Sequence, residues 1–218
     1  MLKAVIFDMD GVLIDSEIEY LKRDLAFAKA RNPEVTREDL FGMVGSSRKD
    51  AWMCMERAVH NGQTWQELRD EFYRERDGFE AVDYRAIFRR EVPGILTELQ
   101  SMGLRLAVAS STQLVLVEQI LAMNEIRSFF ELVVSGEVFR RSKPDPEIYL
   151  YTCKALGIPT GECLAIEDST FGVTAASRAG MRIAALVDHR FHFDQSLADW
   201  RMESLTEIPS IARQLMNG

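Results

Sequence analysis

Two aspartates, Asp8 and Asp10, directly follow a short apolar run, VIF (residues 5–7), near the start of this 218-residue chain. Side chains alternate faces along a strand, so carboxylates two residues apart project the same way where such a strand ends. Like charges at close range raise a carboxyl pKa or recruit a cation, and hard oxygen ligands suit Mg²⁺, in particular when a phosphate supplies further oxygens. The alternative is a solvated turn, which Asp10-Gly11 would also suit.

Polar residues also follow later apolar runs. Ser110 and Ser111 end LAVASS, Lys143 lies in SKPDP, and Glu167 and Asp168 lie in LAIEDS. In an open α/β sheet, ligands collect in the crevice beyond the carboxyl ends of the strands, where these side chains would converge. Each also has a structural explanation, as a helix cap, a surface charge or a solvated first helical turn. Their joint occurrence favours a single site.

The apolar runs predict the elements that position these side chains. Strand-like runs cover 3–7, 104–110, 131–135, 163–167 and 181–187, and from the second onward they alternate with helical segments at 113–124, 146–156 and 170–179. This alternation requires right-handed crossovers and a parallel sheet. We therefore predict an α/β fold with a doubly wound, Rossmann-like parallel sheet.

The stretch between the first two predicted strands is far too long for a simple crossover and contains no convincing strand. Thr36 with Asp39, and Thr64 with Glu67, resemble capping boxes that open helices. We therefore expect an inserted all-α cap domain. The predicted boundaries are 16–86 for the cap and 1–15 with 87–218 for the α/β core.

Composition excludes several classes of partner. The net charge of −8 disfavours a polyanion-binding surface, so nucleic acid is not an expected partner. No apolar stretch approaches the roughly 20 residues that span a bilayer, and the chain opens on a strand-like run, so we expect a cytoplasmic protein without a membrane partner. Cys54, Cys153 and Cys163 are too scattered for a metal or disulfide framework and are predicted to be structural.

Taken together, DMDGV, VASS, SKPDP and IEDS resemble the four ordered motifs of the haloacid dehalogenase-like superfamily. The resemblance spans the whole predicted core. Because the helical insertion follows the first motif, the chain is similar to the subgroup with a small helical cap, which includes β-phosphoglucomutases and sugar-phosphate phosphatases.

The resemblance implies a role for each matching residue. Asp8 would attack phosphorus and form an aspartyl-phosphate. Asp10 would protonate the leaving alcohol and then activate the attacking water or second hydroxyl. Ser110, with Ser111 beside it, would bind the transferring phosphoryl group, and Lys143 would offset its charge and that of the nucleophile. Relatives that cleave carbon–halogen or carbon–phosphorus bonds usually lack the second aspartate, so Asp10 favours phosphoester chemistry.

The same resemblance implies a bound Mg²⁺. Its predicted ligands are the Asp8 carboxylate, the Asp10 backbone carbonyl and Asp168, with Glu167 contributing directly or through water. The metal would allow these carboxylates to lie close together.

The cap is predicted to select the substrate. Arg48, in VGSSRKD, resembles a cap arginine that binds a distal phosphate or polar substrate groups. The alternative is that Arg48 is a solvated surface side chain. Arg76 lies near an apolar helical stripe and is a second substrate candidate, although the stripe favours an arginine that packs its stem at the edge. Many relatives have histidine where this chain has Tyr20, which disfavours a full mutase mechanism.

We therefore predict a Mg²⁺-dependent phosphatase, a phosphoric monoester hydrolase, that acts on a small phosphorylated metabolite, with a sugar phosphate as the expected substrate. A β-phosphoglucomutase-like phosphoryl transfer is the nearest alternative, and a noncatalytic phosphate-responsive binding module is another. A monomer would suffice for any of these.

Overall fold

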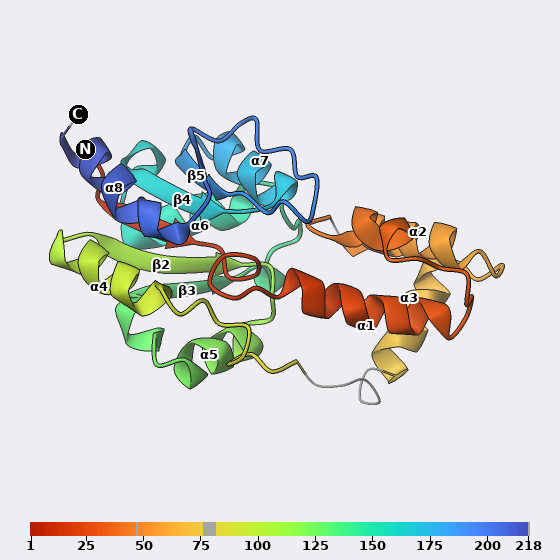
Figure 1. Ribbon diagram of the computed structural model, residues 1–218. Coiled ribbons are helices and arrows are strands. Elements are labelled where there is room, and N and C mark those ends of the chain that lie inside the picture. Colours follow the sequence, from red (N-terminus) through yellow and green to blue (C-terminus); the bar gives the residue numbers. More distant parts are fainter. Residues whose placement is uncertain (47, 76–81, 218) are drawn as a thin grey trace. The chain divides into compact units, whose positions relative to one another are not determined.

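The computed structural model describes residues 1–46, 48–75 and 82–217, and its contacts divide the chain into two compact units (Figure 1). The core unit comprises Met1–Asp15 and Tyr84–Gly218, and the cap unit comprises Ser16–Asp83. The predicted cap, 16–86, begins at the same residue and ends slightly later. Its predicted role in substrate selection stays a prediction.

The core unit is built on one sheet of six parallel strands in the order β3-β2-β1-β4-β5-β6. The strands are β1 (Ala4–Phe7), β2 (Arg105–Ser110), β3 (Leu132–Ser135), β4 (Cys163–Glu167), β5 (Arg182–Leu186) and β6 (Trp200–Met202). The doubly wound, Rossmann-like sheet is therefore confirmed. All five predicted strands are present, and β1 lies at the centre, with β2 and β4 on either side.

Strand β1 is buried along its whole length because both faces of the sheet are covered (Figure 1). Val5 and Phe7 pack into one apolar cluster, and Ala4 and Ile6 pack into the other. This alternation is the period of two that a strand imposes on its side chains. The first face is covered by α4 (Val92–Ser101), α5 (Leu114–Met123) and α8 (Ile208–Asn217), and the second by α6 (Glu147–Leu156) and α7 (Thr170–Arg178).

Strand β6 extends the sheet beyond the last predicted strand and was not predicted. Three residues form it, and they pair in parallel with β5. Met202 is buried but Arg201, between Trp200 and Met202, is exposed, so the segment offers no apolar run. A strand this short at a sheet edge is specified by pairing with its neighbour, which local sequence does not reveal.

The regular elements in the described residues of the cap unit are all helices, as predicted. It contains α1 (Glu17–Lys29), the 3₁₀ helix η1 (Glu38–Met43), α2 (Arg48–Val59) and α3 (Trp65–Glu75). The predicted capping pairs form: Thr36, just before η1, pairs with Asp39 in its first turn, and Thr64, just before α3, pairs with Glu67 in its first turn. None of the helices in the described residues is long and apolar enough to cross a membrane.

An aromatic cluster joins the three α-helices of the cap unit. The rings of Phe27, Trp52 and Phe72 pack edge to face, with centroids 5.2–6.2 Å apart. Edge-to-face pairs contribute about 0.5–1.5 kcal/mol each beyond the area that they bury. Beside this cluster lies a cavity of about 230 Å³, whose lining includes Asp24 and Tyr20.

The carboxyl group of Asp24 is the ionisable group most affected by this environment. Burial raises its pKa from 3.8 to about 7, and the neighbouring Arg23 only partly opposes the effect. A raised folded-state pKa means that ionisation destabilises the fold. The destabilisation is absent below the ordinary pKa of Asp24, where the carboxyl group is protonated in both the folded and the unfolded protein. It is complete above the raised pKa of the folded protein.

We expect Asp24→Asn to raise the melting temperature at about pH 8, because it removes the destabilisation by the ionised carboxylate. The rise should be roughly 2–4 °C for each kcal/mol gained in the free energy of unfolding. The difference from wild type should disappear at about pH 4, where Asp24 is protonated in both the folded and the unfolded state. Thermal melts followed by circular dichroism across this range measure it. Asp70→Asn, at an exposed position of α3, is the control. An Asp24→Asn effect that does not vary with pH would contradict the assignment.

Candidate active site

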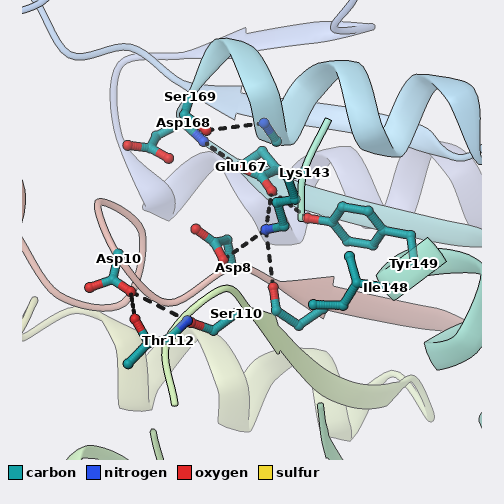
Figure 2. A network of polar contacts seen from close by, with 12 residues as sticks. Asp8, Asp10, Ser110, Thr112, Lys143, Ile148, Tyr149, Glu167, Asp168 and Ser169 are labelled. Atoms are coloured by element: carbon teal, nitrogen blue, oxygen red, sulfur yellow. Dashed lines mark hydrogen bonds and ion pairs between the residues drawn. The ribbon is translucent and has the colours of Figure 1, made fainter. Parts of the chain in front are cut away.

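Five segments of the core unit bring polar side chains together at the carboxyl edge of the sheet (Figure 2). They are the residues after β1, the end of β2 with its following loop, the loop before α6, the first turns of α6, and the end of β4. In a parallel sheet these strand ends lie at one edge, so residues far apart in sequence meet there.

The ammonium group of Lys143 lies at the centre of the network (Figure 2). Its Nζ donates to Asp8 Oδ1 at 2.9 Å, to Glu167 Oε1 at 2.7 Å and to the carbonyl oxygen of Ala109 at 3.1 Å. Only 7% of the side chain is exposed. Burial alone would lower the pKa of Lys143, but the carboxylates of Asp8 and Glu167 raise it well above its ordinary value. The lysine therefore carries a full positive charge in the site.

Asp8 is the partner of Lys143 at the end of β1. Its backbone N–H donates to the carbonyl oxygen of Ile166 at 2.9 Å, which continues the pairing of β1 with β4. Burial raises the pKa of Asp8, Lys143 lowers it, and the nearby Glu167 and Asp10 raise it again. The net effect is a raised pKa, and the contact with Lys143 is what favours the ionised form of Asp8.

Glu167 is fully buried and holds Lys143 from the opposite side. Its Oε1 also accepts a hydrogen bond of 2.5 Å from the Tyr149 hydroxyl, and its Oε2 accepts one of 3.3 Å from the Asp168 N–H. Burial, and then the negative charge of Glu167, raise the pKa of Tyr149 well above its ordinary value, so the phenol stays a donor. Sequence reasoning missed Tyr149, because an aromatic residue in an apolar helical run is indistinguishable from core.

The backbone around Glu167 and Asp168 is equally constrained. Gly172, in the first turn of α7, lies against Glu167, since a Cβ there would come within 1.9–2.2 Å of the carboxylate atoms. Gln195 Nε2 donates to the carbonyl oxygen of Asp168 at 2.5 Å and to that of Leu186 at 2.8 Å. Gln195 was also missed, because it lies in the connection between β5 and β6 and carries no motif.

Asp10 is held by residues at the end of β2 and in the loop that follows it. Thr112 Oγ1 donates to Asp10 Oδ2 at 2.7 Å, and Ser110 Oγ lies 3.5 Å from the same oxygen (Figure 2). Ser110 is buried, as a residue inside the site would be. Ser111 is exposed, and the described part of the chain gives its hydroxyl no hydrogen bond. Sequence reasoning missed Thr112, whose only signal was its position one residue beyond the serine pair.

An acidic cluster beside the lysine has the composition of a site for a hard cation. Asp8, Glu167 and Asp168 each offer a carboxylate oxygen, and these atoms all lie within 4.8 Å of one another. Gly11 has φ +75°, and a Cβ there would lie 2.0 Å from Asp168 Oδ2, so the Asp168 carboxylate packs against the turn that follows Asp10. Such oxygen donors suit Mg²⁺.

The two predicted cap residues stay predictions. Arg48 is the first residue of α2, but its side chain lies outside what the structure describes, and Arg76 lies outside the described residues.

The parallel sheet, the helical insertion and the aspartate–lysine network define a class of hydrolase, and comparison with known families identifies it. The chain belongs to the haloacid dehalogenase-like hydrolase family, whose model matches residues 5–186.

Relatives are similar over nearly the full chain. Hexitol phosphatase B of Escherichia coli (strain K12) is 31% identical over 214 residues, covering 94% of this chain and 93% of that protein. A phosphorylated carbohydrates phosphatase of Thermotoga maritima is 28% identical over 203 residues, covering 91% of each. The solved structure of β-phosphoglucomutase from Clostridium difficile matches with a TM-score of 0.72 at 17% identity over 100% of both chains, which supports the fold.

We expect Gly172→Ala to destabilise the core unit by about 1–3 kcal/mol, since the added methyl group overlaps the buried Glu167 carboxylate. Urea unfolding at constant pH measures the change in the free energy of unfolding.

Gly94→Ala is the matched control, because Gly94 is also the third residue of a helix and a Cβ there would have no atom within 4 Å. This variant should be neutral or more stable by up to about 1 kcal/mol, as alanine favours helix over glycine. Equal stability of Gly172→Ala and wild type would contradict the close packing of α7 on Glu167.

Proposed function

We propose that this protein is a Mg²⁺-dependent phosphatase that hydrolyses a small phosphorylated metabolite, a sugar or polyol phosphate, through an aspartyl-phosphate on Asp8. The observation that carries the proposal is the buried contact of 2.9 Å between Lys143 Nζ and Asp8 Oδ1, with Asp10 held at the same sheet edge. A positive charge beside a fixed carboxylate oxygen is what phosphoryl transfer to that oxygen requires.

In the first step, an Asp8 oxygen forms a bond to phosphorus while the bond from phosphorus to the substrate's alcohol oxygen breaks. Asp10, as a carboxylic acid, gives its proton to that oxygen, and the alcohol leaves. We propose that Lys143 and Ser110 contact the phosphoryl oxygens, so that the charge spread over those oxygens in the transition state is offset.

In the second step, water attacks phosphorus on the opposite side from the Asp8 oxygen. Asp10, now a carboxylate, takes a proton from this water, and the bond between Asp8 and phosphorus breaks to release inorganic phosphate. The cycle ends with Asp10 protonated and Asp8 ionised, as it began.

The donor set proposed for Mg²⁺ is the Asp8 carboxylate, the Asp10 backbone carbonyl and the Asp168 carboxylate. Glu167 already accepts hydrogen bonds at both oxygens, so we propose that it contributes through water and through Lys143 rather than by direct ligation. When bound, the metal supplies positive charge that draws the anionic phosphate to the anionic Asp8.

The substrate class rests on the relatives and on the cap unit. Two of the relatives named above are phosphatases of hexitol phosphates and of phosphorylated carbohydrates. We propose that the cap unit selects the non-phosphate part of the substrate, with Arg48 and Arg76 as candidate contacts. The net charge of −8 fits a small anionic substrate bound by a local basic group better than a polyanionic partner.

A panel of phosphorylated sugars, polyols and short acids, assayed with Mg²⁺ for both phosphate release and isomerisation, tests the function. We expect phosphate release from sugar or polyol phosphates that is abolished by a chelator and restored by Mg²⁺. Asp8→Asn should lower kcat by at least about a thousandfold, because removing a nucleophile removes the covalent route.

Two results would overturn the proposal. Isomerisation that depends on a sugar bisphosphate, with little phosphate release, would identify a mutase. A wild-type protein that is inert across the panel but binds phosphate in the presence of Mg²⁺ would identify a binding module.

A further inference from the structure

The loop after β2 carries a hydroxyl group that does not serve the helix it precedes. Thr112 lies two residues before α5, next to the N-cap position, which Gln113 occupies. Its Oγ1 instead donates to Asp10 Oδ2 at 2.7 Å, and no hydrogen bond in the described chain joins it to α5. The residue at the N-terminus of α5, Gln113, also has no side-chain cap. Helix capping therefore does not explain Thr112.

We propose that Thr112 is a positioning residue that holds Asp10 for proton transfer, an inference that rests on the phosphatase function proposed above. A hydrogen bond to one carboxylate oxygen restricts rotation of the group and fixes where the carboxyl proton is presented. In the first step, up to release of the alcohol, only leaving groups that need a proton benefit from this restriction.

Ser110 also lies near Asp10, but its hydroxyl is not the main hydrogen-bond donor to that carboxylate. Ser110 Oγ lies 3.5 Å from Asp10 Oδ2, at the outer limit of a hydrogen bond, and it accepts the Thr112 N–H at 3.0 Å. The short contact to Asp10 comes from Thr112. The Ser110 hydroxyl proton is therefore available for a phosphoryl oxygen, as its proposed role requires.

The backbone of Thr112 is itself fixed from the next strand. Ser135 Oγ, buried at the end of β3, donates to the carbonyl oxygen of Thr112 at 2.7 Å. Ser135 is paired in register with Ser110, and a Cβ at Gly136 would lie 3.3 Å from the Cα of Ser111. The loop is thus held at both its N–H and its C=O groups, which gives the Thr112 hydroxyl a defined direction.

The test uses kcat/KM, which reports the steps up to alcohol release, for a sugar phosphate and for p-nitrophenyl phosphate. Thr112→Val keeps the shape of the side chain but removes the hydroxyl. We expect it to lower kcat/KM for the sugar phosphate by about tenfold, the lower part of the range for general acid catalysis. The value for p-nitrophenyl phosphate, whose leaving group needs no proton, should stay within about twofold of wild type.

Two further variants separate positioning from folding. Thr112→Ser restores the hydroxyl and should recover most of the sugar-phosphate activity. Ser135→Ala, which loosens the loop without touching Asp10, should show the same substrate-dependent loss in weaker form. Thr97→Val, an exposed site in α4 whose hydroxyl donates to the Pro93 carbonyl oxygen, is the control and should match wild type.

An equal loss for both substrates, or no loss with Thr112→Val, would overturn this inference. Either result leaves the proposed function intact provided that wild type hydrolyses phosphate esters. A wild type without that activity would instead refute the proposed function.

Discussion

A single buried ammonium group, that of Lys143, is the constraint on which the carboxyl edge of the sheet depends. An ammonium removed from water is stable only when charged and polar partners surround it. Here the partners are the carboxylates of Asp8 and Glu167 and the carbonyl oxygen of Ala109, which come from the ends of β1, β4 and β2. The three central strands of the sheet must end together for these contacts to form.

The same constraint explains the tight packing around the acids. Three carboxylates, those of Asp8, Glu167 and Asp168, lie together beside one lysine, so negative charge exceeds positive charge. Glycines at 11 and 172 allow the backbone to approach Asp168 and Glu167 closely, where any side chain would overlap the carboxylates. An excess of negative charge held this rigidly is suited to a divalent cation and to the phosphate ester that such a cation attracts.

The sequence predicted those parts of the fold and site that have a local signal. The five apolar runs became strands, and Asp8 and Glu167 at two strand ends lie in contact with Lys143 from the loop before α6. The parts without a local signal were missed. Strand β6 is defined by pairing with β5. Tyr149 and Thr112 belong to the site because they donate hydrogen bonds to Glu167 and Asp10, which lie 18 and 102 residues away along the chain. Hydrogen bonds across such separations are set by the fold, and a single sequence does not encode them in any short pattern.

The most direct test of the account is to find where the phosphoryl group goes. Wild-type protein mixed with a hydrolysed sugar phosphate and Mg²⁺, then quenched in acid within milliseconds, is digested and analysed by mass spectrometry. We expect a phosphoryl group on the peptide that contains Asp8, at the Asp8 carboxylate, and none on the corresponding peptide of Asp8→Asn. Phosphate release without any phosphorylated protein, or a phosphoryl group on another residue, would contradict the central role given to the Asp8–Lys143 pair.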